Sequence, residues 1–288
     1  MSDPTISTVL AATDFSAHSH QAVLQAAAIA RALGATLSLV YVDDGGEDET
    51  AHGRLTQAAR GLDGIAASAH VAVGHSDEGI VATAAAIDAD LIVTGTHGHT
   101  GLKRFFLGSV AEKVVRLAET NVLVSRPPRP SASDAHAGLF QRILVPTDFS
   151  EASEKALLLA TTLAAPGATI ELFHAWHYPS GLHAHHALPD DEQSPLAGLR
   201  REITAAAREH GARWVANHTT GELTLRFVQA YGPAAAAVQD RLEAEPFELV
   251  AMGTHGRRGF RRFMLGSVAE ATVRHSPCSV LVAHAGDL

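Results

Sequence analysis

Hydrophobic residues along the chain gather in short continuous runs that alternate with longer amphipathic stretches. The runs in the first part are rich in β-branched residues and predict strands near 6–12, 36–42, 68–73, 90–94 and 121–125. The stretches between them predict helices near 16–33, 47–62, 76–88 and 109–118. Strands that alternate with helices form a parallel sheet with helices on both faces, and short fully apolar runs suit strands buried on both sides. We therefore expect an α/β fold of the Rossmann-like kind.

The chain repeats its own landmarks. Thr-Asp-Phe-Ser follows the first strand at 13–16 and returns at 147–150, while Gly-Thr-His-Gly follows the fourth strand at 95–98 and returns at 253–256. The first landmarks lie 134 residues apart and the second lie 158 apart. Two tandem copies of one domain explain this pattern. The second copy carries about two dozen additional residues between its landmarks.

The second copy repeats the strand pattern, near 141–147, 168–175, 222–230, 247–252 and 278–283. A Pro- and Ser-rich stretch separates the copies and is typical of a linker. The sequence thus predicts a first domain at 1–126, a linker at 127–139 and a second domain at 140–288, with an insertion at about 176–195.

Charge and composition narrow the classes of partner. The net charge of −9 and the pI near 6.0 argue against a nucleic-acid-binding surface. Cys278 is the single cysteine, which suits a reducing compartment. Because no apolar run reaches the ~18 residues of a membrane helix and the N-terminus lacks a signal-peptide pattern, we expect a cytoplasmic protein without a membrane partner.

A glycine motif after the fourth strand carries the candidate chemistry. It reads Gly95-x2-Gly98-x9-Gly108-Ser109 in the first copy, and the second copy repeats it at 253–267. Glycine lets the backbone approach a ligand closely, and a Gly-Ser pair that opens a helix offers N–H groups and a dipole to an anion. The pattern favours a phosphate site. An alternative is that Ser109-x-x-Glu112 and its repeat are capping boxes, in which serine caps the helix without any ligand.

Asp14 and Asp148 each follow the first strand of their copy. Ligands of doubly wound sheets lie beyond the carboxyl ends of the strands, so these carboxylates are candidates to accept hydrogen bonds from a ribose or an adenine. The alternative role is to cap the following helix, and Asp148-x-x-Glu151 fits a capping box.

The Thr-Asp-Phe-Ser sequence and the complete glycine motif together resemble the ATP-binding branch of the universal stress protein family, twice and over essentially the whole chain. The resemblance implies tandem five-stranded sheets of order 3-2-1-4-5, related to adenine nucleotide alpha hydrolase-like domains. It also implies nucleotide contacts in the first copy at Ala12, Asp14, Val42, Gly95, Gly98, Gly108, Ser109 and Val110. The matching positions of the second copy are Pro146, Asp148, Ala175, Gly253, Gly256, Gly266, Ser267 and Val268. In this resemblance, Ala175 stands where the family usually has a larger aliphatic residue against the adenine.

The leading hypothesis is an ATP-binding stress-response regulator, which binds ATP with or without Mg²⁺ and presents a surface to a regulated protein. The final strands predict that the two halves pair within one chain, and pairing of whole chains into a homodimer is left open. One alternative is a slow ATPase or a nucleotidyl- or phosphoryl-transfer enzyme, although no Walker motif occurs and we assign no catalytic residue or metal ligand. Another alternative is an interaction scaffold without a nucleotide.

Overall fold

The computed structural model describes residues 5–45, 50–96, 107–127, 139–178, 197–219, 221–254 and 265–284. The first half runs β1 (Thr8–Ala12), α1 (Ala17–Leu33), β2 (Thr36–Asp43), α2 (Ala51–Arg60), β3 (Ala67–Val73), α3 (Ser76–Ala86), β4 (Leu91–Gly95), α4 (Ser109–Leu117) and β5 (Asn121–Ser125). The second half runs β6 (Phe140–Pro146), α5 (Glu151–Thr162), β7 (Ala164–Trp176), α6 (Ala197–His218), β8 (Thr224–Tyr231), α7 (Ala234–Ala244), β9 (Leu249–Gly253), α8 (Ser267–His275) and β10 (Ser279–Ala283). The expected alternation of strands and helices is confirmed.

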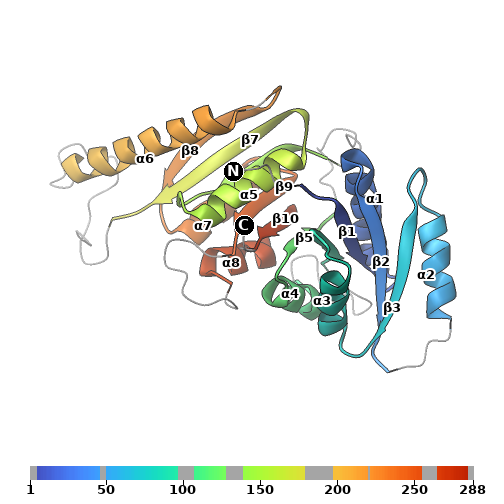
Figure 1. Ribbon diagram of the computed structural model, residues 1–288. Helices are drawn as coiled ribbons and strands as arrows, with labels where there is room; N and C mark the ends of the chain where they lie inside the picture. The colour runs from blue at the N-terminus through green and yellow to red at the C-terminus, as the bar shows by residue number, and fades with distance from the viewer. Residues whose placement is uncertain are drawn as a thin grey trace.

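All ten of these strands belong to one sheet of order β3-β2-β1-β4-β5-β10-β9-β6-β7-β8. Each half has the order 3-2-1-4-5, so the fold class and strand order implied by the family resemblance are confirmed. Pairing within each half is parallel, whereas β5 and β10 pair antiparallel, with Leu123 opposite Leu281. The halves therefore join edge to edge within one chain, as the apolar final strands predicted (Figure 1).

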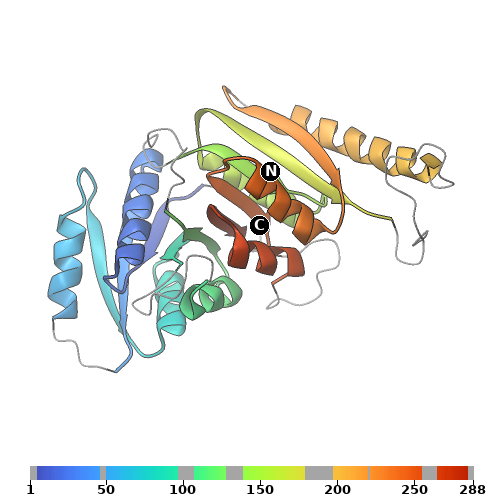
Figure 2. The same cartoon turned by 180° about the vertical axis from the view of Figure 1, so that it is seen from behind.

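The core lies in two layers, one on each face of this sheet. Alternate strand residues such as Leu10 and Val9 are fully buried and point to opposite faces. Helices α1, α2, α5 and α6 pack on the face of Val9, and α3, α4, α7 and α8 pack on the other (Figures 1 and 2). Burial on both faces explains why the strands appear in the sequence as continuous apolar runs.

Local sequence signals set the two ends of α1. Ser16 precedes α1 in an extended conformation, and its hydroxyl accepts a hydrogen bond from the Ser19 N–H. Gly34 ends the helix at φ 67°, and its N–H donates to the carbonyls of Ala30 and Arg31. Glycine is favoured at this left-handed position because it has no Cβ to clash. α1 therefore begins shortly after the carboxyl end of β1.

The interface between the halves includes hydrogen bonds beyond the β5–β10 ladder. The Arg126 backbone N–H donates to Ser279 Oγ at 3.0 Å, and its guanidinium donates to the Val273 carbonyl, also at 3.0 Å. Burial lowers the pKa of the Arg126 guanidinium from its usual value. The Asn121 side chain accepts the His284 N–H at 3.2 Å. The residue that follows each half's last strand is thus bonded to the other half.

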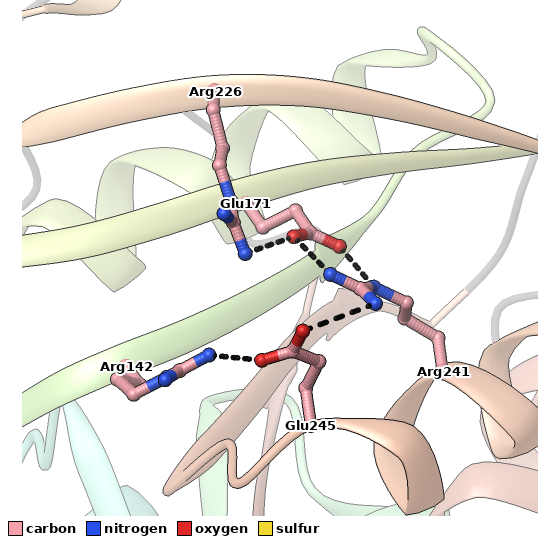
Figure 3. A network of polar contacts seen from close by, with 5 residues as sticks. All are labelled: Arg142, Glu171, Arg226, Arg241 and Glu245. Carbon is pink, nitrogen blue, oxygen red and sulfur yellow. Dashed lines mark hydrogen bonds and ion pairs between the residues drawn. The ribbon is translucent and has the colours of Figure 1, made fainter.

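A buried ion network distinguishes the second half (Figure 3). The Glu171 side chain on β7 is fully buried, and Arg241 of α7 contacts it through two nitrogens at 2.6 and 2.7 Å. Arg226 of β8 contacts the same carboxylate at 2.7 Å. Glu245 links Arg241 at 3.7 Å with Arg142 at 2.5 Å. The hydrogen bond to Glu171 raises the pKa of Arg241, which stays charged.

The predicted domain boundaries stay predictions. The structure places the last residue of β5 at Ser125 and the first residue of β6 at Phe140. Most of the predicted linker, and nearly all of the insertion at 176–195, fall on residues outside the described ranges. Within those ranges, no helix combines the length and apolar character that crossing a bilayer requires.

Substituting alanine for either of two glycines of α6 should change the free energy of unfolding in opposite directions. A Cβ at Gly211 would overlap the Phe227 ring, whereas a Cβ at Gly198 would meet nothing within 4 Å. We expect Gly211→Ala to lower the free energy of unfolding by about 1–3 kcal/mol, because the ring must move out of a packed position. Gly198→Ala should raise it by up to about 0.5 kcal/mol, since alanine favours helix. Urea unfolding of both variants measures this, and equal effects would contradict the packing argument.

Candidate nucleotide site

The two candidate sites lie at the carboxyl edge of the sheet, where the strand order reverses. β1 and β4 are neighbours with Ala11 beside Val93, and the chain leaves them in opposite directions along the sheet. Asp14 therefore emerges beside the end of β4, which is Gly95. β6 and β9 repeat the arrangement in the second half, where Leu144 lies beside Val250. Such a switch point is where ligands of doubly wound sheets bind.

The starts of α4 and α8 are open at this edge. Gly108 is the N-cap of α4 and Gly266 the N-cap of α8, and no described side chain caps either helix. The Gly108 N–H donates to the Thr96 carbonyl at 2.6 Å, and the Gly266 N–H donates to the Thr254 carbonyl at 2.7 Å. Each helix start is thus tied to the residue that follows its neighbouring strand, and among the described residues no side chain accepts a hydrogen bond from its first amides.

The capping-box interpretation of the serines is wrong. Ser109 and Ser267 are the first residues inside their helices, one position after the glycine N-caps, and neither side chain makes a capping hydrogen bond. A glycine at the N-cap has no oxygen with which to accept the amides of the first turn. The sequence therefore places a serine at the first helical position, directly after the glycine N-cap.

The N-cap interpretation of the aspartates is also wrong, because Ser16 and Ser150 cap α1 and α5. Asp14 Oδ1 instead accepts the Ser16 N–H at 3.0 Å, and Asp148 Oδ1 accepts the Ser150 N–H at 3.1 Å. Each carboxylate thus closes a tight turn with one of its oxygens. The turn fixes the carboxylate at the carboxyl edge of the sheet.

The residue between each aspartate and its serine adopts an unusual conformation. Phe15 has φ 63° and Phe149 has φ 61°, both in the left-handed region that bulky residues avoid. The rings are held by neighbours: Phe15 lies 5.0 Å from Tyr41 and Phe149 lies 4.9 Å from His174, between ring centroids. Strain of this kind persists where the surroundings over-determine it, often at ligand sites. Here it occurs at the same position in both halves.

A cluster of hydroxyl groups beside each aspartate was not anticipated from the sequence. Thr13 and Ser19 are 3.1 Å apart between hydroxyl oxygens, and Ser19 Oγ also accepts the Asp14 N–H at 3.3 Å. Thr147 and Ser153 repeat the 3.1 Å contact, and Ser153 Oγ donates to Asp148 Oδ1 at 3.4 Å. The signal was available, because a serine stands five residues after the aspartate in both copies.

Gly95 and Gly253 have a packing reason as well as a candidate binding role. A Cβ at Gly95 would lie 3.0 Å from the His18 carbonyl oxygen, and one at Gly253 would lie 2.7 Å from Ala152 Cβ. The absence of a side chain lets α1 and α5 approach the strand ends. These glycines allow the helix that follows each aspartate turn to pack against the end of β4 or β9.

The residue that the resemblance places against the adenine differs between the halves: it is Val42 in the first and Ala175 in the second. Val42 packs against α3, where its methyl carbons would lie 2.8 and 2.9 Å from a Cβ on Gly79. In the second half, Ala175 is equivalent to Val42, because Val42 pairs with Ala72 as Ala175 pairs with Ala230. Ala237 is equivalent to Gly79, because each is the fourth residue of its helix. A smaller residue on β7 is thus matched in the sequence by a larger one at the equivalent position of α7.

The remaining predicted residues lie close to these features. Ala12 is almost fully buried at the end of β1, Pro146 is its half-buried counterpart, and Val110 and Val268 are in the first turns of α4 and α8. Gly98 and Gly256 lie outside the described residues. Of the predicted set, the structure brings Asp14, Gly95 and Gly108 to one edge in the first half, and it repeats this in the second.

The fold and these paired sites define a tandem α/β protein with two open helix starts at its strand switch points. The chain belongs to the universal stress protein family, whose family model matches residues 5–61, 45–126 and 139–284. Universal stress proteins of Mycobacterium bovis and Mycobacterium tuberculosis are each 30% identical over 203 residues, which is 68% of this chain and 62% of the relative. The chain thus matches less than two thirds of the length of these relatives.

Solved structures support the fold. A universal stress protein from Archaeoglobus fulgidus matches with a TM-score of 0.68 at 21% identity and covers 97% of this chain and 98% of its own. A universal stress protein from Pseudomonas aeruginosa matches with a TM-score of 0.68 at 20% identity, over 97% of this chain and 93% of its own.

Proposed function

We propose that this protein binds one adenine nucleotide in each half, ATP in the first instance, and acts as a regulator in the stress response. The observation that carries the proposal is the pair of open helix starts at Gly108 and Gly266, which no described side chain caps. Backbone N–H groups and the helix dipole at such an end attract phosphate.

The aspartate turns supply the second part of the proposed site. Asp14 and Asp148 stand at the same edge as the glycine-capped helices, and a carboxylate there accepts hydrogen bonds from ribose hydroxyls or an adenine amine. Phosphate donors on one side and a carboxylate acceptor on the other match the two ends of a nucleotide. This complementarity favours a nucleotide over a simple anion.

The geometry favours binding over catalysis. Phosphoryl transfer requires a group that positions the attacking nucleophile and a cation that neutralises the phosphates. In each half, the described part of the site offers backbone amides, hydroxyls, an aspartate that is already engaged in a turn and a glutamate that is already paired with arginine. We therefore propose that nucleotide binding stabilises a surface that a regulated protein recognises.

Native mass spectrometry of the full chain with ATP tests the stoichiometry. We expect a mass increase of two nucleotides per chain, because both helix starts and both aspartates are repeated. Titration with inorganic triphosphate is the matched control and should show weaker binding, since it lacks the adenosine moiety. Absence of binding by ATP, ADP and AMP would overturn the proposal and favour a scaffold without a nucleotide.

A further inference from the structure

Four charged residues form a ring across the boundary between the halves. Glu112 and Arg116 belong to α4, and Glu270 and Arg274 occupy the same positions on α8. Within each helix the pairs are 3.3 and 3.2 Å apart. Between the helices, Arg274 approaches Glu112 at 2.8 Å and Arg116 approaches Glu270 at 3.9 Å. The ring therefore links the two helices whose starts form the proposed phosphate sites.

The carboxylates of this ring lie close to those sites. Glu112 and Glu270 come three residues after Ser109 and Ser267, which is about 4.5 Å along a helix axis. Helical side chains lean toward the N-terminus, so each carboxylate lies back over the first turn. A carboxylate at this place is stabilised by the helix dipole but repels a bound phosphate. Binding of a polyphosphate therefore depends on how fully the glutamate charge is neutralised.

We propose that Arg274 is a positioning residue for nucleotide binding, which the second half supplies to the phosphate site of the first half. It holds the Glu112 carboxylate in a charge-assisted hydrogen bond, which also raises the pKa of Arg274. Arg116 makes the reciprocal but longer contact with Glu270. In each half, the glutamate beside the phosphate site is thus neutralised partly by an arginine of the other half. The contact is shorter at the first site, so Glu112 is neutralised more fully than Glu270 by the other half. This inference rests on the proposed function.

A ring that only fastened the halves together would behave differently. Removing either partner would then loosen the interface, and both single variants would weaken binding or leave it unchanged. The electrostatic role gives the two variants opposite signs. Arg274→Gln leaves the Glu112 carboxylate with only the longer Arg116 contact at 3.3 Å, so its charge repels phosphate more strongly, whereas Glu112→Gln removes a negative charge beside the first site.

Calorimetric titration of the full chain with ADP at low ionic strength measures both signs. We expect Arg274→Gln to weaken binding about two- to fivefold, and Glu112→Gln to tighten one of the two binding steps by a similar factor. The double variant should return that step toward its original affinity. Because all four side chains are partly exposed, the differences should shrink at 0.5 M salt.

Matched controls use an ion pair elsewhere on the molecule. Glu209 and Arg213 are an exposed pair four residues apart on α6, and Glu209→Gln and Arg213→Gln change the net charge equally. These variants should leave the affinity for ADP unchanged. If Glu112→Gln weakens binding or has no effect, the inference is overturned while the proposed function stands. If the unmodified chain binds no ADP or ATP, the proposed function fails first.

Discussion

Arg241→Thr is expected to lower the free energy of unfolding by about 3 kcal/mol. The substitution removes both contacts that Arg241 makes with Glu171 and leaves one oxygen of a fully buried carboxylate without a charged partner. Arg226 still contacts the other oxygen at 2.7 Å. Breaking a buried ion pair on one side is costly because the remaining charge stays desolvated. Urea unfolding, with a linear fit of free energy against concentration, measures the loss.

The first half of the chain supplies the design of the rescue variant. Ser38 lies beside Leu10 in β2 as Glu171 lies beside Leu144 in β7, and Thr83 is the eighth residue of α3 as Arg241 is the eighth of α7. The same fold is therefore built there without this ion pair. We expect Glu171→Ser combined with Arg241→Thr to recover part of the stability that Arg241→Thr alone loses.

An exposed ion pair serves as the control for this experiment. Arg213→Ala removes a contact at 3.9 Å from Glu209 with both side chains more than half exposed, and it should change stability by less than about 0.5 kcal/mol. A loss below about 1 kcal/mol for Arg241→Thr would mean that Arg226 alone satisfies Glu171. A double variant as unstable as the single one would also contradict the argument.

The sequence predicted most of the fold because burial on both faces leaves a clear apolar signal. The run at 121–125 matches β5 residue for residue. β7 is longer than expected: it begins at Ala164, whereas the pattern indicated a start near 168. Pro166 and Gly167 are typical of a turn, yet they lie within this strand, where the register with β6 shifts between Phe140 and Arg142. The start of such an irregular strand is set by pairing with the neighbouring strand, which the local sequence pattern does not reveal.

The sequence predicted that the candidate residues lie at one edge of the sheet, but it did not predict their local geometry. Capping of α4 by serine was the alternative interpretation, since Ser-x-x-Glu fits that role at Ser109. Gly108 takes the cap because its N–H is already bonded to Thr96 at the end of β4, a contact between residues twelve apart. Capping of α1 by Asp14 was the alternative interpretation, and it is wrong because Ser16 takes that place. Phe15, between these two residues, adopts a left-handed conformation that the surrounding sequence does not predict. The first difference arises from a tertiary contact, and the second from a local turn whose phenylalanine packs against Tyr41.

Asp14→Asn is expected to weaken nucleotide binding at the first site about tenfold to a hundredfold, with little change in stability. Asparagine keeps an oxygen that can accept the Ser16 N–H, so the turn before α1 should survive. It replaces the other carboxylate oxygen with an NH₂ donor, which cannot accept a hydrogen bond from ribose or adenine. A hydrogen bond to a charged group contributes about 1.5–3 kcal/mol, which corresponds to the expected loss of affinity.

The two halves allow this prediction to be tested site by site. Asp148→Asn should weaken binding at the second site as Asp14→Asn weakens it at the first, since Asp148 Oδ1 accepts the Ser150 N–H in the same turn. Asp90→Asn is the matched control: its carboxylate accepts backbone N–H groups of Ser7 and Thr8 at the opposite edge of the sheet, away from both sites. Calorimetric titration with ATP and urea unfolding of each variant separate affinity from stability. If both site variants bind ATP like the original chain, the aspartates only shape the turns, and the nucleotide, if bound, is held by the helix starts alone.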